Sequence, residues 1–148
     1  MKLKIVILVV AVVVLVLSFK FLPNNCNCGP KIEIKIGETS LSAEIVDTPE
    51  GRGRGLSGRK SFNNGEGMLF IFDTPAKYGF WMKDMNFDLD MVWIDDVKRV
   101  VGISKGVTKE SYPHIFYPPS EIKYVLEIPS GFSDTAGLDV GQILSTGQ

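Results

Sequence analysis

Short segments with the character of β-strands recur from Lys31 to the end of the chain. From Lys31 to Ile36 charged and apolar side chains alternate strictly, which gives one apolar and one polar face, as in a half-buried strand. Turns rich in Gly, Pro and Asp separate these segments, and no long helical period occurs among them. Further strands are predicted over residues 40–46, 67–72, 78–83, 89–94, 97–103, 121–128 and 140–144. About eight short strands predict a mostly β fold, a single antiparallel β-barrel or β-sandwich.

Two stretches interrupt the strand pattern with helical signals. Thr48 is a suitable N-cap and Pro49 suits the first helical position, but the glycines that follow predict a short or irregular helix. A single helical turn is also predicted within residues 131–138. Between residues 105 and 119 the chain is a long loop, and its aromatic side chains could line a binding surface: Tyr112, His114, Phe116 and Tyr117.

The N-terminus predicts a membrane anchor over residues 1–22. Lys2 and Lys4 precede an uncharged run, and residues 3–22 together are about long enough to span a bilayer, with Lys20 reaching toward its surface. The alternative is a cleaved secretory signal, although no small-x-small cleavage pattern follows the run. With the two N-terminal lysines in the cytoplasm, the domain lies on the extracytoplasmic side.

Residues 23–30 form a linker that contains Cys26 and Cys28, the only cysteines of the chain. Two thiolates supply half of a tetrahedral zinc site, and the single histidine, His114, is far away in sequence, so no metal is expected. In an exported protein the pair is typically disulfide-bonded, and Cys26 or Cys28 could link two chains into a dimer. An exposed pair without a role is the alternative.

Residues 31–146 are predicted to form one compact domain. Thirteen basic and seventeen acidic residues follow Lys20, so this part of the chain carries a net charge of −4. A mildly acidic domain has no net attraction for phosphate backbones, and nucleic acid is therefore not an expected partner.

The segment from Gly67 to Asp95 is strongly apolar and aromatic, yet it contains charged residues at intervals. Lys83 follows Phe80-Trp81-Met82, and Asp90 lies between Leu89 and Met91. Such charges must face water or find partners, because unpaired burial is unfavourable. If the flanking strands pair as a hairpin, Lys83 and Asp90 come close to one another.

Several blocks of the sequence, in order, resemble the DUF192 family over residues 31–146. The blocks are Arg54-Gly55-Leu56-x-x-Arg59, Gly67-Met68-Leu69-Phe70-x-Phe72, Phe80-Trp81-Met82-Lys83, Leu89-Asp90-Met91-x-x-Ile94-Asp95, Tyr124-Val125-Leu126-Glu127 and Gly137-Leu138-x-x-Gly141. The resemblance implies a short exported or membrane-anchored protein with a compact β-rich fold, and it implies no established activity. Two positions depart from the family pattern. Ser57 stands where the family usually has Met, and Asp84-Met85 stands where it usually has Asn-Thr.

The charged and aromatic residues of these blocks are the candidates for a binding site: Arg54, Arg59, Trp81, Lys83, Asp90, Asp95 and Glu127. Three hypotheses stay open. The charges form a structural ion-pair network, or they bind a small polar or carbohydrate ligand on which Trp81, Trp93 or Tyr78 stacks. The third is a hydrolase in which Asp90 with Glu127, or Asp95, acts as acid and base. No cofactor is expected, and a Ser or Cys catalytic triad is disfavoured because the chain has one histidine.

Overall fold

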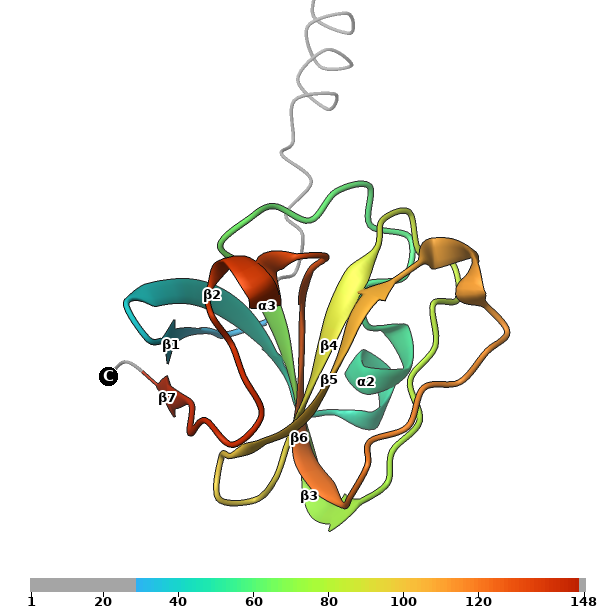
Figure 1. The fold of residues 1–148 in the computed structure, drawn as a ribbon. Helices are drawn as coiled ribbons and strands as arrows, with labels where there is room; N and C mark the ends of the chain where they lie inside the picture. Colours follow the sequence, from blue (N-terminus) through green and yellow to red (C-terminus); the bar gives the residue numbers. More distant parts are fainter. Residues whose placement is uncertain (1–28, 147–148) are drawn as a thin grey trace, which may run out of the picture.

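The computed structural model describes residues 29–146 (Figure 1). The predicted anchor over residues 1–22 and the cysteines of the linker lie outside the described residues, so the predictions made for them stay predictions. Within residues 29–146, no helix combines the length and the apolar character that crossing a membrane would require.

Seven strands form one curled sheet in the described residues, in the order β5-β4-β6-β3-β2-β1-β7. The prediction of a mostly β fold is confirmed, but that of an antiparallel barrel or sandwich of about eight strands is wrong. The sheet is mixed, because β2 and β3 pair in parallel while every other pair is antiparallel. The strands are β1 (Lys31–Ile36), β2 (Thr39–Val46), β3 (Glu66–Ala76), β4 (Leu89–Ile94), β5 (Val100–Val107), β6 (Ile122–Pro129) and β7 (Ser145–Thr146).

A crossover connection explains the parallel pair, since β3 can run beside β2 in the same direction only if the chain returns to the starting end. The return begins with helix α2 (Pro49–Arg54), whose N-cap is Thr48 as predicted. The Thr48 hydroxyl accepts a hydrogen bond of 3.1 Å from the amide of Gly51. The other helices of the described residues are α3 (Phe132–Thr135), within the predicted helical turn, and the 3-10 helix η1 (Lys109–Ser111).

The sheet buries side chains on both faces, and each face has its own core. Successive residues of a strand point to opposite faces, so β4 sends Asp90, Val92 and Ile94 into a first core and Leu89, Met91 and Trp93 into a second core. The first core also contains Leu126 and Ile128 of β6 and lies toward α3. The second contains Phe70 and lies toward α2. All six side chains of β4 are therefore buried.

The C-terminal segment joins the two edges of the curled sheet at one end. The amide of Leu144 donates to the carbonyl of Lys98, and residues 141 and 142 bond with Val100 at the start of β5. Directly after Leu144, β7 pairs with β1 on the opposite edge. This arrangement places β7 between the edges in Figure 1. The sheet therefore resembles a barrel at this end and stays open elsewhere.

The segment Tyr78–Lys83, predicted as a strand, is part of an irregular loop over residues 77–88. Within it, Phe80 alone forms a β-bridge, and its partner is Phe116 in the loop that precedes β6. The segment is aromatic because its rings pack on the second core, with Phe80 lying 5.7 Å from the ring of Trp93. Side-chain packing without a continuous strand partner therefore explains its composition.

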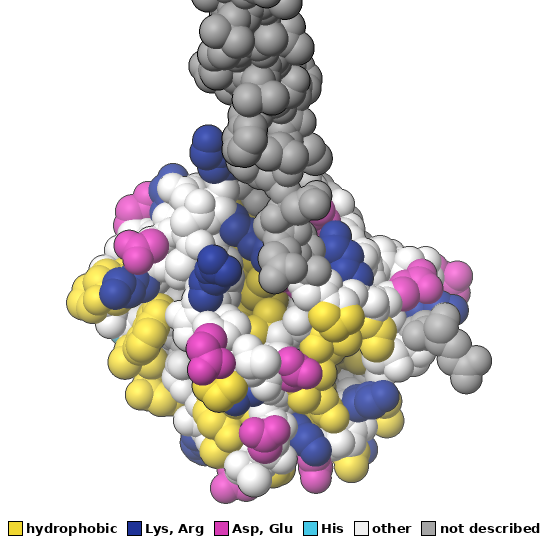
Figure 2. All heavy atoms as spheres, turned by 180° about the vertical axis from the view of Figure 1, so that it is seen from behind, with side chains coloured by type: hydrophobic (Ala, Val, Ile, Leu, Met, Phe, Trp, Pro, Cys, Tyr) yellow, Lys and Arg dark blue, Asp and Glu magenta, His cyan; other side chains and the backbone are white. Residues whose placement is uncertain are grey.

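Charges of both signs are distributed over the face turned away in Figure 1. Figure 2 shows Lys and Arg side chains interspersed with Asp and Glu, with separate hydrophobic patches between them. Where the described residues are visible on this face, no continuous basic surface of the kind that binds phosphate backbones is present.

Candidate functional site

A cleft of about 250 Å³ opens on the α2 side of the sheet, and we call it the aromatic cleft. It is lined by α2 and the turn that follows, by Phe70 and Phe72 of β3, by the 77–88 loop and by one residue of β6, Glu127. The elements that line it are distant in sequence. The cleft therefore exists only because the β2–β3 crossover brings α2 over the same face as the 77–88 loop.

Aromatic rings form the wall of this cleft. Phe72 and Tyr78 stack with centroids 3.6 Å apart and planes 10° apart, and Phe70 meets Phe80 edge to face at 5.0 Å. Trp81 is 49% exposed at the mouth. Edge-to-face and stacked pairs of this kind stabilise one another beyond their buried area, so the wall is a rigid surface.

Glu127 is the only carboxylate among the described residues that line the cleft. Its side chain is 5% exposed and lies between Met68 of β3 and Met91 of β4, its partners in the register of the sheet. Within residues 29–146 no group donates a hydrogen bond to it and no cation forms an ion pair with it. Burial raises the pKa of Glu127 to about 8, and the nearby charge of Arg59 offsets part of this effect. At neutral pH the carboxyl group is therefore mostly protonated, and it can both donate and accept a hydrogen bond.

Two arginines of α2 lie at the rim of the cleft and behave differently. The guanidinium of Arg52 is fixed, since it donates to the carbonyl oxygens of Asp47 and Ile71 and lies 5.1 Å from the centre of the Phe72 ring. Arg54 is exposed, and its guanidinium makes no hydrogen bond or ion pair with the part of the chain that the structure describes. Arg54 therefore has donors available for a ligand in the cleft.

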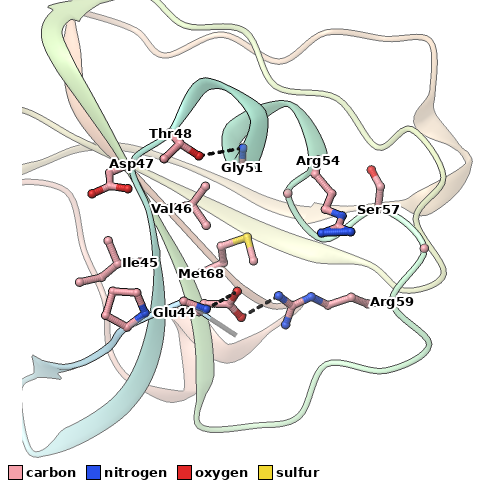
Figure 3. Close-up of a pocket in the computed structure, with 14 residues that line it drawn as sticks. Glu44, Ile45, Val46, Asp47, Thr48, Gly51, Arg54, Ser57, Arg59 and Met68 are labelled. Atoms are coloured by element: carbon pink, nitrogen blue, oxygen red, sulfur yellow. Dashed lines mark hydrogen bonds and ion pairs between the residues drawn. The ribbon is translucent and has the colours of Figure 1, made fainter. Parts of the chain in front are cut away.

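A larger hollow of about 790 Å³ adjoins the cleft, and the two share Arg54, Gly55 and Ser57 (Figure 3). In this hollow the Arg59 guanidinium donates to Glu44 at 2.6 Å, and Glu44 also accepts a bond from the amide of Gly29. The ion pair ties the start of the described chain to the turn after α2. Both carboxylate oxygens of Glu44 already have partners in the protein. The polar contacts in this hollow therefore stabilise the fold and are not available to a ligand.

The predicted contact between Lys83 and Asp90 is wrong. Lys83 is exposed on the 77–88 loop, whereas Asp90 is fully buried and points into the first core. Asp90 accepts hydrogen bonds from the amides of Gly106, Gly131 and Ser133 at 2.8, 3.0 and 3.1 Å, and from the Ser133 hydroxyl at 2.6 Å. Four donors satisfy this carboxylate without any cation. Its role in the structure is to join β4, the Gly106 region of β5 and α3.

The predicted acid–base pairing of Asp90 with Glu127 also fails on geometry. Met91, and not Asp90, is the β4 residue opposite Glu127, so the two carboxyl groups lie on opposite faces of the sheet. They cannot flank one bond of a substrate. Asp95 lies in the turn between β4 and β5, where its Oδ1 accepts bonds from the amides of Val97 and Arg99. Asp95 does not line the aromatic cleft.

Of the candidates predicted from the sequence, the structure brings Arg54, Trp81 and Glu127 together at one cleft. Arg59 adjoins it and acts on Glu127 through its charge. Trp93, one of the predicted stacking residues, is buried in the core and donates to the Ser104 hydroxyl, while Tyr78 does line the cleft. Arg52 and Phe80 also line the cleft but are not among the site candidates named from the sequence, although Arg52 lies only two residues before Arg54. No group of three or more His, Cys, Asp or Glu side chains that could hold a metal ion occurs in residues 29–146.

Two curated proteins of archaea are similar to this chain in sequence. The "UPF0127 protein TK1120" of Thermococcus kodakarensis is 28% identical over 102 residues, which is 69% of this chain and 62% of that protein. A "UPF0127 protein" of Thermococcus gammatolerans is 28% identical over 102 residues, 69% of this chain and 64% of that protein. The match thus spans a little over three-fifths of the length of these relatives.

Solved structures with the same fold are also known. A protein of Sinorhizobium meliloti 1021, described as a "putative transcription regulator", superposes with a TM-score of 0.72 at 25% identity, covering 78% of this chain and 92% of that chain. A protein of unknown function from Novosphingobium aromaticivorans DSM 12444 gives a TM-score of 0.69 at 22% identity, covering 78% and 83%. The second likeness shows the fold alone. The model of the family DUF192, described as "Uncharacterized ACR, COG1430", matches residues 32–146, and the chain therefore belongs to the DUF192 family.

Proposed function

We propose that this domain binds a small polar ligand with an apolar face, a sugar-like molecule, in the aromatic cleft. The observation that carries the proposal is Glu127, a carboxyl group that lines a cleft open to solvent and has no hydrogen-bond partner in the described residues. No side-chain oxygen or nitrogen of the described residues is both fully enclosed and without a partner, so the carboxyl oxygens of Glu127 are reached from the cleft. A ligand in the cleft can therefore form hydrogen bonds with Glu127.

The aromatic wall supports a ligand with a flat apolar face. Tyr78 and Trp81 reach the mouth of the cleft, where their rings are partly exposed. Apolar walls with a few convergent polar groups are typical of small-molecule sites. The volume of about 250 Å³ is below the range usual for drug-sized ligands, so it suits about one six-membered ring.

The charges of the cleft support a neutral or acidic ligand over a cationic one. Glu127 is mostly neutral at pH 7 because of its raised pKa, while Arg52 and Arg54 place two positive charges at the rim. A protonated carboxyl group bonds a hydroxyl in both directions, and the free guanidinium of Arg54 suits a hydroxyl or a carboxylate. A sugar or a sugar acid presents these groups around an apolar ring face.

Titration with glucose, galactose, N-acetylglucosamine and galacturonic acid tests this proposal, with tryptophan fluorescence of the full chain in detergent as the readout. We expect at least one of these probes to bind, and we expect Glu127→Gln and Trp81→Ala each to weaken binding tenfold or more. Glu121→Gln is the matched control, because Glu121 is exposed just before the same strand. Arg54→Gln should weaken the binding of galacturonic acid more than the binding of galactose. Failure of all four probes, or unchanged binding by Glu127→Gln, refutes the proposal.

We propose further that residues 1–22 anchor the domain in a membrane and leave it on the extracytoplasmic side. The support is the uncharged run after Lys2 and Lys4, and the linker cysteines are then available to join two chains through Cys26 or Cys28. Fusion of a reporter that is active only in the cytoplasm to the C-terminus tests the orientation, since strong activity contradicts export. Non-reducing electrophoresis tests the dimer, which Cys26→Ser with Cys28→Ser should abolish.

A further inference from the structure

Two loops lie side by side next to the aromatic cleft. Phe80 of the 77–88 loop and Phe116 of the loop before β6 exchange two backbone hydrogen bonds of 2.9 and 2.8 Å. The loops are the neighbouring yellow-green and orange traces to the right of the sheet in Figure 1. Both phenylalanine rings pack against the second core. Because side chains alternate along extended backbone, the residues on either side of each phenylalanine face outward.

The outward-facing residues form one continuous apolar surface, which we call the aromatic ledge: Gly79, Trp81, Ile115 and Tyr117. The three side chains are 49%, 37% and 59% exposed, in that order. Around the antiparallel bridge, Trp81 lies opposite Ile115 and Gly79 lies opposite Tyr117. Exposed apolar surfaces that are continuous mark interaction sites more often than scattered single residues do.

Gly79 allows the ring of Tyr117 to lie close to the backbone of the neighbouring loop. A Cβ atom at position 79 would lie 2.7 Å from Cγ2 of Ile115 and 2.8 Å from Cε1 of Tyr117. Both side chains therefore lie across the glycine, and any larger residue would displace them. Because position 79 has no side chain, no atom projects from the ledge between Trp81 and Tyr117.

The ledge continues the wall of the aromatic cleft, because Gly79 and Trp81 belong to both. We propose that the ledge binds further sugar units of an oligosaccharide whose first unit occupies the cleft, which rests on the function proposed above. A chain of sugar rings offers repeated apolar faces to stack on aromatic rings and hydroxyl edges to water. The ledge itself contains no charged residue, in agreement with a ligand of this kind. The cleft is too small for more than about one ring, so the additional units must lie outside it.

Affinity as a function of chain length tests the ledge. The probes are cello-oligosaccharides and chito-oligosaccharides of one to six units, titrated by calorimetry into the full chain in detergent. We expect Kd to fall at least tenfold between one unit and four units in at least one series. Tyr117→Ala should remove this gain while leaving the affinity for one unit unchanged, since Tyr117 does not line the cleft. Gly79→Ala should also reduce the gain because it displaces the Tyr117 ring.

Two controls separate the ledge from the cleft. Tyr112→Ala removes another exposed tyrosine of the same loop. This variant should show the same increase in affinity with oligosaccharide length as the wild type. Glu127→Gln should weaken the binding of oligosaccharides of every length by a similar factor. Binding of a single unit without any gain in longer chains overturns the ledge and leaves the cleft proposal standing. A gain in affinity that persists in Tyr117→Ala also overturns the ledge. Failure of both series at every length overturns the ledge as well, whereas the cleft proposal is decided by the four single-sugar probes.

Discussion

Replacing Glu127 with Gln should make the stability of this domain much less dependent on pH. Burial raises the pKa of Glu127 in the folded chain to about 8 from an ordinary value of 4.5. Between these two values the folded state holds a proton that the unfolded state has released. The folded state therefore binds more protons in this window, and the free energy of unfolding falls as pH rises through it.

The size of the effect follows from the width of the window. Each pH unit within it is worth about 1.4 kcal/mol, so the titration of Glu127 should lower the free energy of unfolding by on the order of 4–5 kcal/mol between pH 4.5 and 8. The Gln side chain has nearly the same shape as that of Glu but does not ionise. The variant should match the wild type near pH 4 and be more stable than it at pH 9.

Urea denaturation followed by tryptophan fluorescence measures this difference, because Trp93 is buried and reports on the core. The full chain in detergent is compared at pH 4, 6, 8 and 9, with Glu121→Gln as an exposed control that should keep the wild-type dependence. A wild-type curve that is flat between pH 5 and 8 would falsify the assignment of a raised pKa to Glu127. A slope that survives in the Gln variant would assign the titration to another group.

The remaining predictions concern structural residues, and each is measured by the same denaturation. Asp90→Asn should destabilise the fold by about 2–4 kcal/mol, because an amide nitrogen would face backbone donors in a fully buried site; a loss below 1 kcal/mol contradicts the described role. Gly67→Ala should cost about 1–3 kcal/mol, since the new Cβ would lie 2.7 Å from Cδ1 of Leu41; an unchanged stability would mean that the leucine can move aside. Thr48→Ala should cost about 1 kcal/mol through loss of the cap on Gly51, and Thr48→Ser should restore it.

The strands of this domain could largely be predicted because their signal is local. The alternation over Lys31–Ile36 reflects one buried face, and β1 has the predicted bounds. Leu89–Ile94 was also predicted with the correct bounds, although it is buried on both faces. Pairing is not local, and nothing in β2 or β3 alone indicates that they run in parallel. That relation depends on the α2 crossover, where three glycines weaken the helical pattern.

The candidate site could be predicted only in part. Arg54, Trp81 and Glu127 meet at the cleft, but their meeting depends on contacts between elements that are far apart in sequence. Lys83 and Asp90 do not meet because Tyr78–Lys83 is a loop with a single bridge, and only a strand there could pair with β4 as a hairpin. The face of a strand on which Asp90 or Glu127 lies depends on register. Only the alternation within β4 and β6 and their pairing show that the two carboxyl groups are separated by the sheet.

The backbone hydrogen bonds of the C-terminal segment cover both edge strands of the sheet, β5 and β1. Gly141, Gln142 and Leu144 occupy backbone groups at the start of β5, and Ser145 and Thr146 occupy those of β1. A chain cut after Leu138 would uncover amides and carbonyls on both borders, which are templates for pairing with another copy. The last eight described residues thus protect the domain against self-association through its strands.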